Sequence, residues 1–242
     1  MVAANILQMS TFSQIFLDSI EIIFQLQSNY LDIIVISLHV SLSAILVSGL
    51  ICVPLATVIA INDFYLKNTL MVFINSLLAL PPVVVGLIIY ILLSRFGLFG
   101  EYDLLYTISA MIIAQVTLIS PILISLVKET MDDYHKKYKD YFISVHSSDY
   151  RKIITLIWES KINLFIHILV AFGRALSEVG AILIVGGNIE NLTRTMTTGI
   201  TLETSKGELA IALSLGLTLL LISLFINIIL YIIKRRISTD YV

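Results

Sequence analysis

The stretch from Gly173 to Ile189 reads GRALSEVGAILIVGGNI, and two opposite charges interrupt its apolar run. Arg174 and Glu178 stand four residues apart, so a helix places both on one face within reach of an ion pair. A charge at the centre of a membrane helix costs about 2.5 to 3.5 kcal/mol on insertion scales, and it usually faces a bundle interior or a wet cavity. Two interpretations stay open: the pair fastens helices together, or Arg174 lowers the barrier for a passing anion.

Few other residues have the spacing that catalysis or metal binding requires. The single cysteine, Cys52, cannot build a disulfide framework or a thiolate metal cluster within one chain. His39 and His167 are isolated in apolar runs, which favours core packing over metal ligation. No GxSxG elbow is present, and none of the 11 glycines is followed by Lys, so a phosphate-binding P-loop is absent. The sequence predicts neither an enzyme nor a metal site.

The elements that must position Arg174 and Glu178 are membrane helices. Of the 242 residues, 58% are hydrophobic and 13% are charged, and the mean hydropathy is +0.97. Such values lie outside the range of soluble domains. A net charge of −2 also argues against nucleic-acid binding, because no excess of Lys and Arg is available to neutralise phosphates. At about 1.5 Å per residue, Arg174 lies roughly 20 Å along a helix that begins at Lys161, near mid-membrane.

Five segments reach the roughly 20 apolar residues that a membrane helix needs. They are Ile33 to Ile61, Leu70 to Leu93, Leu104 to Val127, Ile162 to Val185 and Leu209 to Ile233. The sequence therefore predicts an all-α integral membrane protein with about five spans, organised as a single transmembrane domain over residues 1–242 and surrounded by the lipid of the plasma membrane.

Basic residues set the expected orientation, because Lys and Arg in short loops stay in the cytoplasm. Seven lie between the third and fourth spans, namely Lys128, Lys136, Lys137, Lys139, Arg151, Lys152 and Lys161, and Lys234 to Arg236 follow the fifth. We therefore expect the N-terminus outside and the C-terminus in the cytoplasm. Residues 11–28 alternate apolar and acidic faces at helical spacing, which predicts an interfacial helix on the outer side.

Residues 128–161 are too polar to cross a membrane, yet aromatic and β-branched residues stand between their charges. The pattern predicts two short helices around HSSDYRK, with Ser148 or Asp149 as the N-cap of the second. Either this loop folds into a docking surface, or it is a solvated loop whose lysines only set the topology.

The run from Asp140 to Gly187 resembles the cytoplasmic loop and following helix of ABC-importer permeases of the molybdate and tungstate group. The family's loop motif, Glu-Ala-Ala, three residues, then Gly, reads here Asp140, Tyr141, Phe142 and His146, and Trp158 and Glu159 replace its later Leu-Pro pair. Three further strings carry the resemblance over most of the chain: LPPVVVGL from Leu80, GRALSEVGA from Gly173 and TRTMTTGITLETSKGELA from Thr193. Together they are most similar to tungstate permeases.

This resemblance implies a type I ABC-importer permease fold working as a homodimer. It also implies a cytoplasmic subunit that binds and hydrolyses ATP with Mg, and an extracytoplasmic protein that delivers the oxyanion; this chain itself would hold no cofactor. The implied coupling residues are Asp140, Tyr141, Phe142, His146, Ser147, Asp149 and Arg151. Those of the path or its charge pair are Arg174, Glu178, Pro81 and Pro82, and those that contact the delivery protein are Thr193, Arg194 and Thr195.

Several alternatives stay open. Pro81 and Pro82 either shape a gate or only kink a span, and the loop with Thr193 to Thr195 either contacts a partner or supports the last span. The solute is tungstate, molybdate, sulfate or another anion. A secondary transporter or channel needs no ATPase, but the first two spans show no similarity to the last two that would indicate inverted repeats. A membrane scaffold explains the buried charges least well.

Overall fold

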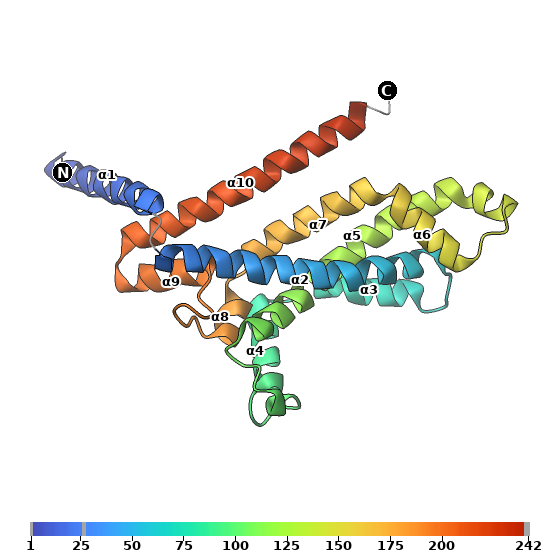
Figure 1. Cartoon of the computed structure of the whole chain (residues 1–242), viewed down its shortest axis with the longest axis horizontal. Coiled ribbons are helices and arrows are strands. Elements are labelled where there is room, and N and C mark those ends of the chain that lie inside the picture. Colours follow the sequence, from blue (N-terminus) through green and yellow to red (C-terminus); the bar gives the residue numbers. More distant parts are fainter. Residues whose placement is uncertain (1, 26–27, 240–242) are drawn as a thin grey trace.

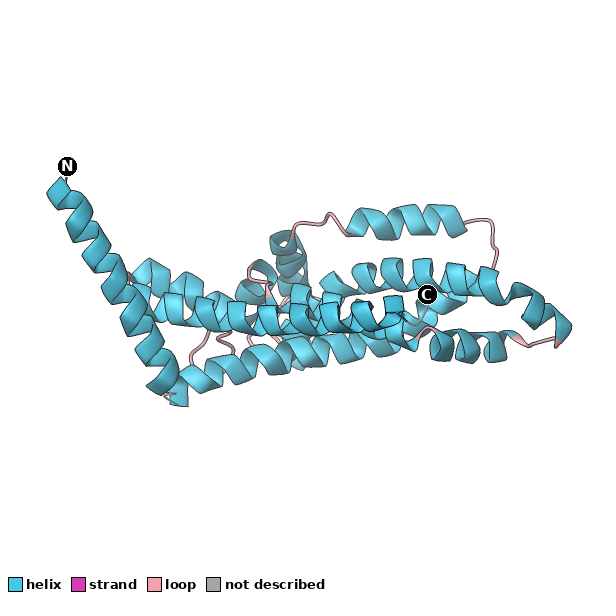
Figure 2. Cartoon of the chain, turned by 90° about the horizontal axis from the view of Figure 1, so that it is seen from above, coloured by secondary structure: helices cyan, strands magenta, loops and turns pink. Residues whose placement is uncertain are grey.

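The computed structural model describes residues 2–25 and 28–239, and within these ranges every regular element is a helix (Figures 1 and 2). In chain order they are α1 (Val2–Gln25), α2 (Ser28–Ile61), α3 (Lys67–Leu77), α4 (Pro82–Leu93), the short 3₁₀ turn η1 (Gly100–Tyr102), α5 (Ile108–Ser144), α6 (Asp149–Glu159), α7 (Lys161–Leu176), α8 (Gly180–Gly186), α9 (Met196–Lys206) and α10 (Leu209–Thr239).

Three helices are long and apolar enough to cross a membrane by themselves: α2, α5 and the part of α10 from Leu209 to Ile233. Two bent pairs also qualify, α3 with α4 at an angle of 98° and α6 with α7 at 70°. The described chain thus has three to five spans, which agrees with the all-helical membrane fold predicted from the sequence.

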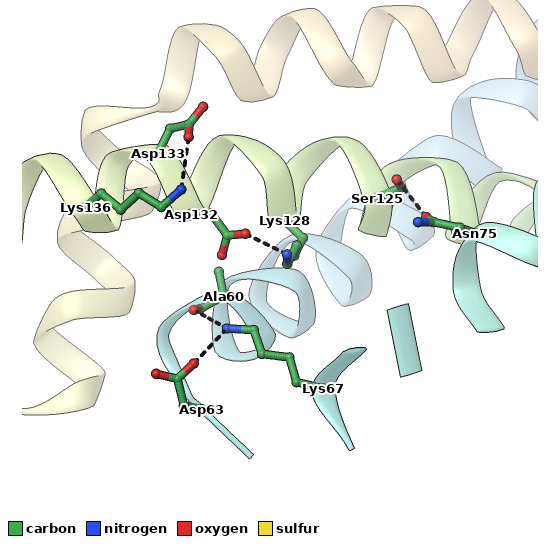
Figure 3. Close-up of polar contacts among 9 residues, drawn as sticks. All are labelled: Ala60, Asp63, Lys67, Asn75, Ser125, Lys128, Asp132, Asp133 and Lys136. Carbon is green, nitrogen blue, oxygen red and sulfur yellow. Dashed lines mark hydrogen bonds and ion pairs between the residues drawn. The ribbon is translucent and has the colours of Figure 1, made fainter. Parts of the chain in front are cut away.

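The third predicted span is longer than its apolar run. Instead of ending near Val127, α5 continues to Ser144, so the first of the two short loop helices is in fact the end of α5. Ion pairs one turn apart support this polar half, Lys128 with Asp132 at 2.6 Å and Lys136 with Asp133 at 3.9 Å (Figure 3). The second short helix is α6. Ser148 occupies its N-cap position but makes no side-chain capping bond.

The fourth predicted span is broken rather than continuous. Helix α7 ends at Leu176 and α8 begins at Gly180, so the run predicted from Ile162 to Val185 contains a break at residues 177–179. Within the second predicted span, α4 leaves the bundle direction at nearly a right angle to α3 (Figure 1). Two of the predicted spans are therefore interrupted in their interior.

The main core lies where α2 and α5 run side by side with α7 against them (Figures 1 and 2). Small side chains of α2 make this close approach possible, and Ser37, Ser41, Ala44 and Ser48 are all buried. A second core joins α4, α5 and α8, and a third joins α1, α2, α9 and α10 around Tyr30.

Helix α1 covers the described part of the interval 11–28, of which residues 26–27 lie outside the described ranges. It packs against α10 and leans away from the bundle in both views (Figures 1 and 2). Its Phe12, Phe16 and Phe24 are exposed, so an apolar face is available to a membrane surface. The interfacial position of this helix stays a prediction.

Candidate functional site

Arg174 and Glu178 lie at the break between α7 and α8. The guanidinium Nη1 of Arg174 is 3.4 Å from Oε2 of Glu178, which makes the predicted i,i+4 ion pair. Their surroundings differ, because 49% of the Arg174 side chain is exposed and only 6% of the Glu178 side chain is. The carboxylate is thus held inside by the pair, while the outer half of the guanidinium stays accessible. This geometry fits a structural pair and still presents positive charge at one face.

Two polar side chains from other helices, which the sequence analysis did not single out, form hydrogen bonds to the backbone at this break. Buried Gln115 of α5 donates from Nε2 to the carbonyl oxygen of Ala175 at 2.9 Å, and Thr197 of α9 donates from Oγ1 to the Glu178 carbonyl at 2.9 Å. Thr197 thus bonds a carbonyl group at the break, and Gln115 gives the Ala175 carbonyl a second donor beside the Glu178 N–H at 3.2 Å. The available signal was Gln115 itself, a lone amide inside the apolar run of the third span.

Pro81 and Pro82 begin a helix rather than kink one. Pro81 is the N-cap of α4 and Pro82 its first residue, a position where the missing proline N–H costs nothing. The start of α4 meets the start of α8, because a Cβ added at Gly180 would lie 2.6 Å from Cγ2 of Val83. The structure therefore brings the two helix breaks together, although Pro81 and Glu178 are far apart in the sequence.

Glycine makes the α4–α8 contact possible. A Cβ added at Gly86 would lie 2.7 Å from the Cα of Ala181, a backbone atom that cannot rotate away. The two half-helices consequently touch through their backbones and act as one packed unit.

The predicted coupling residues gather at the far end of α5 and the start of α6. Asp140, Tyr141, His146, Asp149 and Arg151 are exposed there. Between them lies a hollow of about 270 Å³, which is lined by Tyr141, Val145, Ser147, Arg151, Ile154 and Thr155. A hollow with both polar and apolar side chains in its lining and one cation, Arg151, is suited to receive a side chain from another protein.

Phe142 does not belong to this exposed surface. Only 4% of the residue is exposed, and its ring packs 6.2 Å from the rings of both His135 and Tyr138, measured between centroids. Its predicted role as a docking residue is therefore corrected to a packing role. His146 has φ of 48°, in the left-handed region that favours glycine, and this is the position where the resembling family has Gly.

The predicted contact residues of the outer loop are turned inward. Thr193 donates from Oγ1 to the Gly186 carbonyl at 2.6 Å, and Thr195 caps α9, so both hydroxyls are buried and used within the chain. The Arg194 side chain is 13% exposed and pairs with Glu190 at 3.7 Å. Direct contact by Thr193 and Thr195 is wrong for this conformation. The exposed part of the loop instead includes Ile189, Asn191 and Leu192.

His39 is exposed on α2, and His167 lies 2.7 Å from the Thr130 hydroxyl through Nε2. Among the residues described, no three His, Cys, Asp or Glu side chains are grouped so as to hold a metal ion.

Interrupted membrane helices that meet at a half-buried charge pair, together with a folded polar end, are typical of membrane transport proteins. The family described as "Binding-protein-dependent transport system inner membrane component" matches residues 52–239, and the chain belongs to this family.

Individual relatives agree over most of the chain. The tungstate uptake system permease protein TupB of Peptoclostridium acidaminophilum is 36% identical over 218 residues, covering 90% of this chain and 96% of the relative. The protein of the same name from Campylobacter jejuni is 41% identical over 173 residues, 72% of each chain. A probable anion ABC transporter permease protein of Haloferax volcanii is 34% identical over 201 residues, 81% of this chain and 87% of the relative.

These findings confirm the resemblance seen in the sequence. The chain is the permease subunit of an ABC importer and a multi-pass protein of the plasma membrane, and its family has a transport role rather than an enzymatic one. Membership also implies two kinds of partner, an ATP-binding subunit and a substrate-binding protein.

Proposed function

We propose that this permease carries tungstate inward as a homodimer, driven by ATP that the partner subunit binds with Mg. The observation that supports tungstate as the substrate is the 36% identity to a tungstate uptake permease over 96% of that relative's length. Molybdate is the second candidate, because it is a tetrahedral dianion like tungstate, and a permease for another anion is supported by the relative named only for anion transport.

The proposed docking surface for the ATP-binding subunit is the hollow at the α5–α6 turn. Tyr141 and Arg151 line it, and exposed Asp140 and Asp149 flank it. We place the contact with the substrate-binding protein at Ile189 to Leu192, in the exposed part of the outer loop, near the opposite end of the bundle.

Helix α5 supplies the proposed mechanical link between ATP hydrolysis and the path. It is one helix from Ile108 to Ser144 and carries Tyr141 at the hollow and Gln115 at the α7–α8 break. At about 1.5 Å per residue these two side chains lie roughly 39 Å apart along the axis. A push at the hollow therefore reaches the break through one continuous helix, in which Pro121 removes one backbone hydrogen bond between the two sites.

At the break, the packed unit of α4 and α8 acts as the proposed gate. The pair Arg174–Glu178 presents a partly neutralised positive charge there, which attracts a dianion without holding it. Weak binding is what conduction requires, because an unpaired buried cation would retain its ligand. The permease forms no covalent bond with its cargo.

The test is uptake of labelled tungstate by cells that express the chain with its neighbouring genes, with molybdate and sulfate as competitors. We expect unlabelled tungstate to block accumulation at far lower concentration than molybdate. Equal competition by molybdate or sulfate would reassign the substrate, and uptake of none of these anions would leave the family assignment without a known cargo.

A further inference from the structure

A second pocket, of about 360 Å³, lies where α1, α2, α9 and α10 meet, at the end of the bundle opposite the coupling hollow (Figure 1). Its polar side carries Glu190, Arg194, Glu203 and Lys206. The proposed gate and the ATP-subunit contact use none of these four charges, and only Glu190 falls within the proposed contact with the substrate-binding protein.

The charges are balanced and only partly satisfied. Lys206 Nζ lies 2.9 Å from Glu203 Oε1, whereas Arg194 Nη1 is a long 3.7 Å from Glu190 Oε2. The Nε of Arg194 is buried and has no hydrogen-bond partner in the part of the chain that the structure describes. An anionic oxygen in the pocket would add a charge-assisted partner to the Lys206 ammonium, whose side chain is 49% exposed, and to the guanidinium of Arg194, which Glu190 holds only loosely.

The pocket lies where the apolar runs of α2 and α10 begin, which is where the boundary between hydrocarbon and headgroups is expected. Tyr30 stands just before the apolar run of α2, and Lys206 stands just before α10. The Tyr30 hydroxyl donates to the Ser214 carbonyl at 3.0 Å, which ties these two helix starts together.

The rest of the lining is mostly apolar, apart from Asn29 and the hydroxyl end of Tyr30. Its apolar side chains are Ile22 of α1, Ile33 of α2, and Ile211 and Leu215 of α10. A pocket that is charged at one end and mostly apolar at the other, at the expected interfacial depth, has the shape of an amphiphile.

We propose that this pocket binds the headgroup of a phospholipid that carries a primary amine, such as phosphatidylethanolamine. The phosphate accepts hydrogen bonds from Arg194 and Lys206, and the ammonium group donates to Glu190 and Glu203. The acyl chains leave over Ile22, in the joint between α1 and the bundle. A free dianion is a poorer match, because the two carboxylates repel it.

The same four charged side chains should distinguish this lipid from phospholipids with other headgroups. A choline headgroup keeps the positive charge but has no N–H to donate to the carboxylates. A glycerol headgroup has no positive charge and leaves both carboxylates without a cationic partner from the ligand. The amine is therefore the feature that the pocket distinguishes.

The experiment measures lipid retention by native mass spectrometry and thermal unfolding of the full chain in detergent, with dioleoyl phosphatidylethanolamine, phosphatidylcholine or phosphatidylglycerol added. The wild type is expected to retain phosphatidylethanolamine selectively, at one per chain, with a raised Tm. Glu203→Gln combined with Lys206→Gln should weaken its retention roughly tenfold, the effect of losing charge-assisted hydrogen bonds. The control, Asp133→Asn with Lys136→Gln, removes an ion pair of the same i,i+3 spacing at the other end of the bundle. It should leave the retention of phosphatidylethanolamine unchanged.

Glu190→Gln gives a second test. The side chain itself is 59% exposed, but the change weakens the pairing of Arg194, which is 13% exposed, so the Tm without added lipid is measured alongside. The variant should reduce the preference for the amine lipid over the choline lipid while overall binding persists. Equal retention of all three lipids by the wild type, or unchanged selectivity in both pocket variants, would overturn the proposal.

Discussion

Arg174 and Glu178 belong to one ion pair but depend on it unequally. Removing Arg174 leaves a carboxylate that is 6% exposed without its partner, whereas removing Glu178 leaves an arginine whose side chain is half exposed at the surface of the chain. Losing the partner of a buried charged group is the more costly of the two.

Arg174→Gln should therefore destabilise the protein by about 1–3 kcal/mol, and Glu178→Gln by clearly less. The double variant should recover part of the loss from Arg174→Gln, because the buried carboxylate is then gone. Thermal unfolding in detergent measures all three. A greater loss for Glu178→Gln would contradict the inward placement of the carboxylate.

His146 occupies a left-handed backbone position with φ of 48°. This conformation costs an L-residue about 1–2 kcal/mol and costs glycine almost nothing. His146→Gly should therefore raise the unfolding temperature of the purified chain. Val145→Gly is the control, since φ there is −96° and a glycine should destabilise it. A lower Tm for His146→Gly would mean that the imidazole makes a contact worth more than the strain.

At the scale of elements, the packing of α4 on α8 depends on two glycines with unequal tolerance. A methyl group at Gly86 meets a backbone atom at 2.7 Å, whereas one at Gly180 meets the end of the Val83 side chain at 2.6 Å. Gly86→Ala should therefore reduce stability by about 1–3 kcal/mol and lower uptake, and Gly180→Ala should have the smaller effect.

Gly49 is the matched control for this pair, because a Cβ there meets nothing within 4 Å. Gly49→Ala should be neutral or stabilising by up to about 1 kcal/mol, the helix preference of alanine over glycine. If Gly86→Ala behaved like Gly49→Ala in uptake and in unfolding, α4 and α8 would not move as one packed unit.

The α5–α6 turn should transmit ATP hydrolysis to the path. Asp140→Lys combined with Tyr141→Lys reverses charge on an exposed surface, so the fold should persist while ATP hydrolysis is uncoupled from transport. Phe142→Ala instead removes a buried ring and should lower stability by about 3–5 kcal/mol. Measuring uptake and ATPase activity together separates the two effects. Unchanged uptake in the double lysine variant would remove the docking assignment.

Apolar length alone predicts some elements and fails for others. The span from Leu209 to Ile233 coincides with the apolar part of α10 because nothing interrupts the run. The break at residues 177–179 escapes such an analysis, since three residues scarcely lower the average of a long window. Its polar partners, Gln115 and Thr197, come from other helices, and only tertiary packing brings them there.

The buried state of Phe142, Thr193 and Thr195 also lies beyond what spacing can indicate. A motif position shows that a residue belongs to a loop, and the direction of its side chain depends on what packs beneath it. For Phe142 that is the helix end itself, with the rings of His135 and Tyr138.

At the scale of the whole molecule, the basic residues predict that the α5–α6 turn lies in the cytoplasm and α9 outside. Ser144→Cys and Ser205→Cys place exposed thiols on these two regions, while native Cys52 is buried. In intact cells a membrane-impermeant maleimide should label Ser205→Cys, and it should reach Ser144→Cys only after permeabilisation. The reverse labelling pattern would invert the proposed orientation.

ATP-driven tungstate import is tested most directly by measuring tungstate accumulation in proteoliposomes that contain this chain, its ATP-binding subunit and its substrate-binding protein. An ATP-driven importer should accumulate tungstate with hydrolysable ATP and should accumulate none with a non-hydrolysable analogue. Equal accumulation without ATP hydrolysis would contradict an ATP-driven importer and favour a secondary transporter or channel.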